Sequence, residues 1–204
     1  MKIPFRGWTI DADNFRTHAR NFFDHNNFND SDLFFPVTLQ GARINGWELT
    51  LRSPRIDNRA QLYLTYSNQL ALSFGCITGG LVAPCGTPPP SYGLLDHDQR
   101  NTLHIGGKFT LPWNAYASTD VYYASGFTNG GAIPGRPDHL EPHTIFDVSV
   151  GENFGDRFSI NAQGINVANR RVLLDNSFTF GGTHYNNPAK FSFKCAIVSS
   201  TEGL

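Results

Sequence analysis

Apolar and polar residues alternate with a period of two along most of the chain, and a 3.6-residue period is almost absent. Successive side chains of a strand point to opposite faces, so this alternation predicts strands with one apolar and one polar face. The clearest case is the segment 102–111, in which Leu103, Ile105 and Phe109 alternate with polar neighbours. Eight strands are predicted in this way, at 8–15, 35–51, 60–69, 102–111, 117–127, 146–150, 158–163 and 190–197.

The connections between these strands alternate between short and long. Short turns are expected at 53–58, 112–115 and 153–156, and long polar loops at 17–33, 74–100, 128–143 and 170–187. A meander whose turns are short at one end and long at the other is expected of an outer-membrane β-barrel. The predicted fold is therefore all-β, an antiparallel up-and-down meander of about eight long strands that forms a segment of a transmembrane β-barrel.

Charged and aromatic residues fit this interpretation. Unpaired charges are costly in a protein core but are accommodated in a watery barrel lumen. The polar faces of the predicted strands carry charged residues, among them Asp11, Glu48, Lys108, Asp120 and Asp147. Rings close to the strand ends suit the aromatic girdles of a membrane barrel. They are Trp113, Phe154 and Phe158 beside short turns, and Tyr122, Tyr123 and Phe127 towards a long loop.

Composition narrows the function classes. The chain has 204 residues, enough for one domain, and its 16 Lys and Arg against 17 Asp and Glu give a net charge of −1. Such a balance provides no overall field to attract nucleic acid or an anionic membrane surface. No apolar run approaches the roughly 18 residues of a transmembrane helix. The first residues, MKIPFRGWTIDAD, do not have the pattern of a secretory signal peptide.

Cysteine, histidine and acidic residues are the candidates for chemical sites in the loops. Cys76 and Cys85 bracket the sequence ITGGLVAP, so they form either a loop disulfide or two unpaired thiols. Two clusters of acids and histidines fall in loops, where ordinary solvated side chains are expected because neither cluster has a metal-ligand spacing. These clusters are Asp96, His97 and Asp98, and Asp138, His139, Glu141 and His143. No nucleophile motif or phosphate-binding glycine loop is present, so we predict a non-enzyme without catalytic, cofactor or metal residues.

Four segments resemble the last strands of TonB-dependent outer-membrane receptors, most closely the Oar-like subgroup. They are ARINGWELTLRSP (42–54), LDHDQRNTL (95–103), NAYASTDVYYASGFTNG (114–130) and INVANRRVLLDNSFTFGGTHYNNP (165–188). The resemblance extends over about residues 3–193. Within INVANRR, Asn166 and Asn169 are expected to fix the departure of the chain from the strand by hydrogen bonding.

The resemblance implies a plugged barrel that takes up a nutrient with energy relayed by TonB, with outer-membrane lipid around it. Residues 1–204 would form a C-terminal fragment of the barrel without a plug domain, and would not transport by themselves. Residues 195–204 form an atypical tail, because family members usually end on an aromatic residue.

Two other interpretations are compatible with the sequence. One is a self-contained eight-stranded outer-membrane protein, since eight strands can close a small barrel. The other is a soluble β-sandwich that binds carbohydrate through its aromatic residues. The first predicts pairing between the first and last strands, and the second predicts a folded monomer that needs no detergent.

Overall fold

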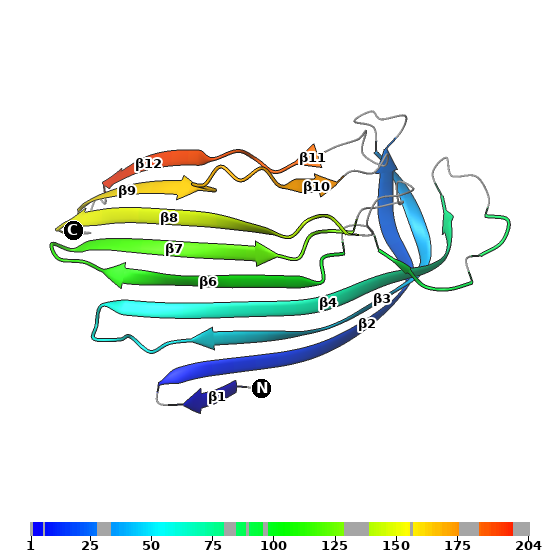
Figure 1. Cartoon of the computed structure of the whole chain (residues 1–204), viewed down its shortest axis with the longest axis horizontal. Coiled ribbons are helices and arrows are strands. Elements are labelled where there is room, and N and C mark those ends of the chain that lie inside the picture. Colours follow the sequence, from blue (N-terminus) through cyan, green and yellow to red (C-terminus); the bar gives the residue numbers. More distant parts are fainter. Residues whose placement is uncertain are drawn as a thin grey trace, which may run out of the picture.

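The computed structural model describes residues 2–5, 7–27, 34–79, 85–88, 90–95, 98–128, 139–155, 157–175 and 184–197. They form one long antiparallel sheet and a small separate hairpin (Figure 1). In the sheet the strands follow the order β1-β2-β3-β4-β6-β7-β8-β9-β12, and β5 pairs with the far part of β4. The strands are β1 (Lys2–Phe5), β2 (Trp8–Asn27), β3 (Phe34–Arg52), β4 (Ala60–Thr78), β5 (Gly93–Leu94), β6 (Asn101–Thr110), β7 (Ala115–Ala124), β8 (His143–Phe154), β9 (Phe158–Ile165), β10 (Leu173–Asp175), β11 (His184–Tyr185) and β12 (Lys190–Ile197).

The predicted up-and-down meander is confirmed. All eight strands expected from the alternation are present as β2, β3, β4, β6, β7, β8, β9 and β12, and each pairs antiparallel with the next. Residues 195–197 of the atypical tail continue β12 and pair with β9, whereas 198–204 lie outside the described residues. Within the described residues, no helix has the length and apolarity needed to cross a membrane.

The two ends of the sheet differ in the way the chain turns. Figure 1 shows the connections β1–β2, β3–β4, β6–β7 and β8–β9 together at one end, and the longer connections at the other. The β6–β7 turn places Trp113 and Asn114 at φ values of 60° and 58°. Two successive left-handed residues make a turn whose twist matches that of the flanking strands. Short and long connections thus lie at opposite ends of the sheet, as the sequence predicts.

The strands β2 and β4 extend much further than the alternation predicts, whereas β3 differs from its predicted range of 35–51 by one residue at each end. The segment 17–33 was expected to be a loop, yet β2 continues to Asn27 and pairs with β3 as far as Phe34. Thr17–Asn27 is mostly polar on both faces, so it shows no two-residue period although it is a strand. The long connections also contain β5 and the β10–β11 hairpin, which were not predicted.

The sheet is open and one of its faces is apolar and exposed. Within the described residues, β1 and β12 are the two edges and do not pair with each other. Exposed large side chains lie at alternate positions, among them Val150 at 53% and Phe193 at 66% exposure. No second sheet packs on this face within the described part of the chain. This arrangement matches neither a closed eight-stranded barrel nor a β-sandwich.

Buried apolar residues are few and lie mainly towards the end with the long connections. The described residues of this kind are Val37, Leu39, Ala42, Ala71, Ala124, Leu140 and Val172. A chain of this length would ordinarily bury most of its large apolar side chains in one core. The strands are therefore held together mainly by their backbone ladder and cross-strand contacts.

Candidate functional site

The polar face of the sheet carries a row of residues at paired positions on successive strands. Arg52 of β3 pairs with Tyr63 of β4, and Tyr63 pairs with Gly106 of β6. Gly106 pairs with Asp120 of β7, which pairs with Asp147 of β8. Directly paired residues lie on the same face of an antiparallel sheet. The row, defined here as Arg52, Tyr63, Gly106, Asp120 and Asp147, therefore forms one band across five strands.

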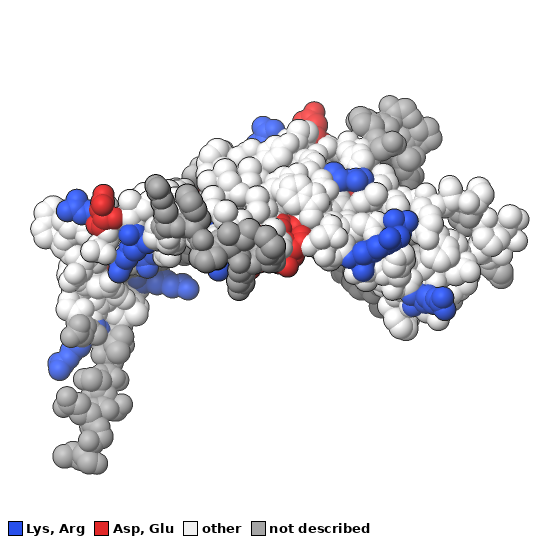
Figure 2. All heavy atoms as spheres, turned by 90° about the horizontal axis from the view of Figure 1, so that it is seen from below, with Lys and Arg blue, Asp and Glu red and all other residues white. Residues whose placement is uncertain are grey.

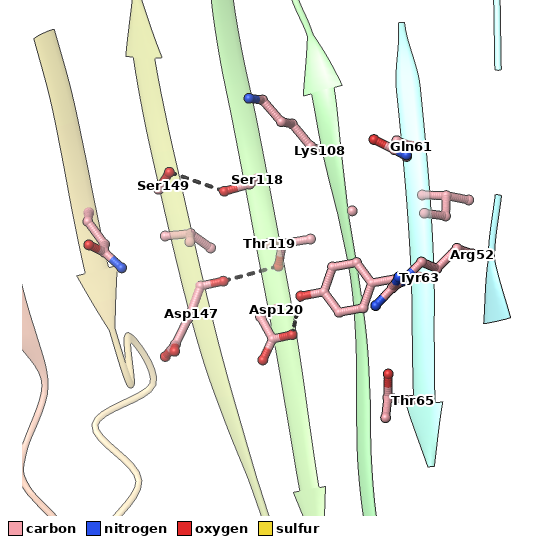
Figure 3. Close-up of a pocket in the computed structure, with 14 residues that line it drawn as sticks. Arg52, Gln61, Tyr63, Thr65, Lys108, Ser118, Thr119, Asp120, Asp147 and Ser149 are labelled. Atoms are coloured by element: carbon pink, nitrogen blue, oxygen red, sulfur yellow. Dashed lines mark hydrogen bonds between the residues drawn. The ribbon is translucent and has the colours of Figure 1, made fainter. Parts of the chain in front are cut away.

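Gly106 allows the ring of Tyr63 to cross β6. A Cβ atom at position 106 would overlap the Tyr63 hydroxyl and would lie 2.5 Å from the carbonyl oxygen of Thr119. The hydroxyl donates a hydrogen bond to Asp120 Oδ2 on the strand beyond (Figure 3). An aromatic ring that covers a glycine on the neighbouring strand is a recognised way of fixing strand register. The Tyr63–Gly106–Asp120 contact thus ties β4, β6 and β7 together.

Asp120 also contacts a histidine, which extends the row towards the long connections. His104 Nδ1 lies 3.1 Å from Asp120 Oδ1. The His104 ring packs on the Tyr122 ring with centroids 4.6 Å apart. Tyr122 in turn accepts a hydrogen bond of 2.7 Å from Gln99 Nε2. A continuous set of polar and aromatic contacts therefore runs along the sheet from Tyr63 to Gln99.

Tyr122 does not belong to an aromatic girdle on the apolar face, so that expectation was wrong for this residue. Its register partners are His104 and Ile145, which puts it on the polar face. Tyr123, the next residue, pairs with Leu103 on the apolar face and fits the girdle. Adjacent aromatic residues of one strand necessarily point to opposite faces.

Asp147 is held by the segment that follows β9. The backbone N–H of Asn166 donates to Asp147 Oδ1 at 2.7 Å. Asn166 is only 3% exposed, and its side chain bonds to the backbone of Arg170 and Asn187. Asn169 Oδ1 accepts a hydrogen bond of 3.0 Å from Ala189 N. The expected role of Asn166 and Asn169 in fixing the chain after the strand is confirmed.

A second ring crosses a glycine near the short-turn end of the same face. The Tyr116 ring of β7 lies where a Cβ atom of Gly151 in β8 would be. Asn161 Nδ2 of β9 donates to the Tyr116 hydroxyl at 3.0 Å. Lys108 Nζ lies 4.9 Å from the centre of the same ring. The tyrosine–glycine crossing is thus used twice, and each tyrosine bonds to a polar side chain on the strand beyond the glycine.

An open hollow of about 670 Å³ lies over this part of the sheet. Figure 3 shows side chains from several strands pointing into it. Its border combines cations, acids, hydroxyls and amides, represented by Arg52, Lys108, Asp120, Asp147, Ser118, Ser149, Gln61 and Gln163. Such a mixture can form hydrogen bonds to water, to a polar solute or to another polar protein surface. The charges Asp11, Glu48, Lys108, Asp120 and Asp147 all lie on this face, as predicted.

Cys76 and Cys85 are close together in the structure. Their sulfur atoms lie 1.94 Å apart and their Cα atoms 5.7 Å apart, the spacing of a disulfide. The third cysteine, Cys195, is exposed and unpaired. Formation of the Cys76–Cys85 bond in the mature protein remains a prediction.

The two loop clusters have different outcomes. Asp96, His97 and Asp138 lie outside the described residues. Asp98 and His143 are buried, at 2% and 6% exposure, so the expectation of solvated side chains was wrong for these two residues. Asp98 Oδ1 accepts a hydrogen bond of 2.7 Å from Ala71 N, which explains its burial as an anchor for the connection before β6. Among the described side chains, no group of three or more His, Cys, Asp or Glu is arranged to hold a metal ion.

The central tyrosine of the row, Tyr63, was not predicted from the sequence. Tyr63 lies between Gln61 and Thr65, and therefore on the polar face, but it was not assigned to that face. An aromatic residue at a polar position of the alternation was the available signal. Its partner Asp120 is 57 residues away, and that pairing depends on the register of three strands.

Comparisons with known proteins identify the fold. No family model matches the chain, and no curated protein matches it. Solved structures do match. The ferric-catecholate import receptor Fiu from E. coli K12, in its closed form, has a TM-score of 0.63 and 16% identity over 94% of this chain and 25% of that chain. The copper transporter OprC has a TM-score of 0.66 and 10% identity over 96% of this chain and 30% of that chain.

A third structure gives the same result. FpvA of P. aeruginosa, solved with a heterologous pyoverdine and iron, has a TM-score of 0.62 and 10% identity over 93% of this chain and 24% of that chain. All three proteins are TonB-dependent receptors with a β-barrel fold. The chain therefore has the fold of the wall of such a barrel, and it spans about a quarter to a third of their length.

Proposed function

We propose that this chain is part of the wall of an outer-membrane TonB-dependent receptor, and that the assembled receptor takes up a small nutrient. The observation that carries the proposal is the two-faced open sheet. One face is apolar and exposed at alternate positions, the other holds charges and hydrogen-bonding groups, and short turns gather at one end. A barrel wall needs lipid on the first face and water or polar protein on the second.

The apolar face supports a lipid environment. Ile105, Phe146 and Val148 have exposures of 44%, 41% and 43% although they lie in the middle of the sheet. Monomeric soluble proteins rarely expose a continuous apolar surface of this kind. We assign outer-membrane lipid as the partner of this face and the outer membrane as the location of the protein.

The open edges support the need for further strands. Unpaired backbone groups at a sheet edge cost several kcal/mol each in hydrocarbon, so membrane sheets close into barrels. Residues 1–204 are assigned as a C-terminal portion of the wall, with no plug among them and no transport by this portion alone. In the assembled receptor, TonB and a small solute are the expected partners, and the protein acts as a transporter and not as an enzyme.

The folding behaviour of the full chain tests this proposal. We expect aggregation in buffer, and no compact heat-modifiable barrel on gel electrophoresis in detergent, because two edges remain unpaired. A soluble monomer with a cooperative melting transition would favour the carbohydrate-binding β-sandwich. A heat-modifiable monomer in detergent would favour the self-contained eight-stranded barrel.

A further inference from the structure

A group of basic residues lies on the apolar side of the sheet, just beyond the apolar belt. Arg16, His18 and Arg20 occupy alternate positions of β2, and Arg43 of β3 pairs directly with His18. They share a face with Ile10, Leu49 and Leu51, because positions two residues apart on a strand point the same way and Leu51 and Leu49 pair directly with Ile10 and Ala12 of β2. Arg16, His18, Arg20 and Arg43 are called the basic cluster below.

The side chains on this face change in a defined order along the strands. Leu49, Leu51 and Leu64 come first from the short-turn end. Trp47 and Tyr66 follow, with ring centroids 4.9 Å apart, and Trp47 is 43% exposed. On β2 and β3 the basic cluster lies beyond these rings, whereas β4 carries Leu70 and Leu72 at the same height, as the partners of Asn45 and Arg43. Apolar residues, then a Trp–Tyr pair and then arginines is the order found across the boundary between hydrocarbon and lipid headgroups.

The basic cluster has no acidic neighbour on its face. The described positions of this face, from Ile10 to Arg20 in β2 and from Gly41 to Leu51 in β3, contain no Asp or Glu. Arg16, His18 and Arg20 are exposed, and Arg43 is half-buried, with its Nε 3.4 Å from Asn45 Oδ1. Arg16 and Arg20 lie diagonally across from Arg43, two residues on either side of its partner His18, so the three guanidinium groups repel each other. Figure 2 shows basic groups, without acidic ones among them, at the end where β2–β4 extend.

We propose that the basic cluster binds the phosphates of lipid headgroups in the outer leaflet of the membrane. This inference rests on the proposed function, since it requires the apolar belt below the cluster to lie in lipid. Phosphate groups at the membrane surface would stand at the height of the arginines and would offset their mutual repulsion. The chain as a whole is nearly neutral, so the cluster is a local feature that net charge conceals.

Flotation with lipid vesicles tests the inference. The full chain is diluted from urea into phosphatidylcholine vesicles, with or without phosphatidic acid, and its partition coefficient is measured. Two variants are compared, Arg16→Thr/Arg20→Thr and Lys190→Thr/Lys194→Thr. Each removes two exposed cations four residues apart on one strand, but Lys190 and Lys194 lie on the polar face. Far-UV circular dichroism checks that all three proteins have the same β-content.

The expected result is tighter binding of the unchanged chain when phosphatidic acid is present. For vesicles with phosphatidic acid, the partition coefficient of the arginine variant should be lower on the order of 30-fold, whereas that of the lysine variant should be unchanged. Equal losses in both variants would overturn the inference in favour of non-specific charge. In a further arm, inorganic phosphate replaces chloride at equal ionic strength. If phosphatidic acid then no longer tightens binding, the basic cluster is a site for a soluble anion, and this result would also overturn the inference. Failure of the unchanged chain to bind vesicles of either composition would also overturn the inference, whereas the proposed function is tested separately by the folding experiment above.

Discussion

The hydroxyl of Tyr63 donates a hydrogen bond to Asp120, two strands away in the sheet. The bond spans β6 only because Gly106 has no side chain between the two residues. The contact joins three strands at one height and sets their register on the polar face. In a sheet with little buried apolar core, such contacts have a large share in selecting one register.

Substitution of Gly106 by alanine should destabilise the sheet. The added Cβ would overlap the Tyr63 hydroxyl and approach the Thr119 carbonyl oxygen, so the ring must move and its bond to Asp120 is lost. We expect a cost of about 1–3 kcal/mol, the usual range for forced overpacking. The measurement is the urea concentration at which half of the β-structure of the vesicle-bound chain is lost, detected by circular dichroism.

Two controls separate crowding from the hydrogen bond. Gly93→Ala adds the same methyl group where no atom lies within 4 Å, and should leave the midpoint unchanged. Tyr63→Phe keeps the ring and removes the hydroxyl, and should cost about 1 kcal/mol. If Gly106→Ala unfolded at the same urea concentration as the unchanged chain, the proposed role of the crossing would be wrong.

Cys76 and Cys85 should be joined in the oxidised protein, leaving one free thiol. In urea without reductant, a maleimide should label only Cys195, whereas all three cysteines should react after reduction. Mass spectrometry of the labelled peptides identifies the cysteines that carry the maleimide. A disulfide that closes a loop of this size contributes roughly 2–3 kcal/mol, so reduction should lower the urea midpoint. Labelling of Cys76 without reductant would contradict the pairing.

Asn166 should matter more to the sheet than Asn169, although both have left-handed backbone conformations, with φ values of 51° and 48°. Alanine at either position suffers similar backbone strain, so the difference reports the side-chain bonds. Asn166→Ala removes three hydrogen bonds between the buried Asn166 side chain and the backbone of Arg170 and Asn187, whereas Asn169→Ala removes one, so we expect an added cost of about 2 kcal/mol for Asn166→Ala.

Proteolysis of the vesicle-bound chain measures this difference. The segment between β9 and β12 should be cleaved faster in Asn166→Ala than in Asn169→Ala, with fragments identified by mass spectrometry. Equal cleavage rates in the two variants would contradict the proposed role of the Asn166 side chain.

The sequence was sufficient to predict the strands whose two faces differ in polarity. In β6 and β8 the alternation of Ile105 or Phe146 with polar neighbours reflects a boundary between two environments, so the pattern reveals strand and face together. The far part of β2 has no such boundary. There, pairing with β3 determines the strand, and this information is not local to residues 17–27.

The candidate site was predictable only in part. The acidic residues of the row follow from the alternation, and so does their common face. The bond from Tyr63 to Asp120 and the burial of Asp98 and His143 depend on which strands become neighbours and on their register. A single sequence does not contain these relationships in a local pattern.

The orientation of β8 provides the most direct test of the central claim that one face of the sheet lies in lipid. Spin labels are placed singly at positions 145–150 of the vesicle-bound chain, with Cys195 replaced by alanine and the other two cysteines left bonded. Labels at Phe146, Val148 and Val150 should be highly accessible to oxygen and poorly accessible to a water-soluble nickel complex, and labels at Asp147 and Ser149 should show the reverse. Equal accessibility at successive positions, or free access of the nickel complex to Phe146, Val148 and Val150, would contradict the central claim.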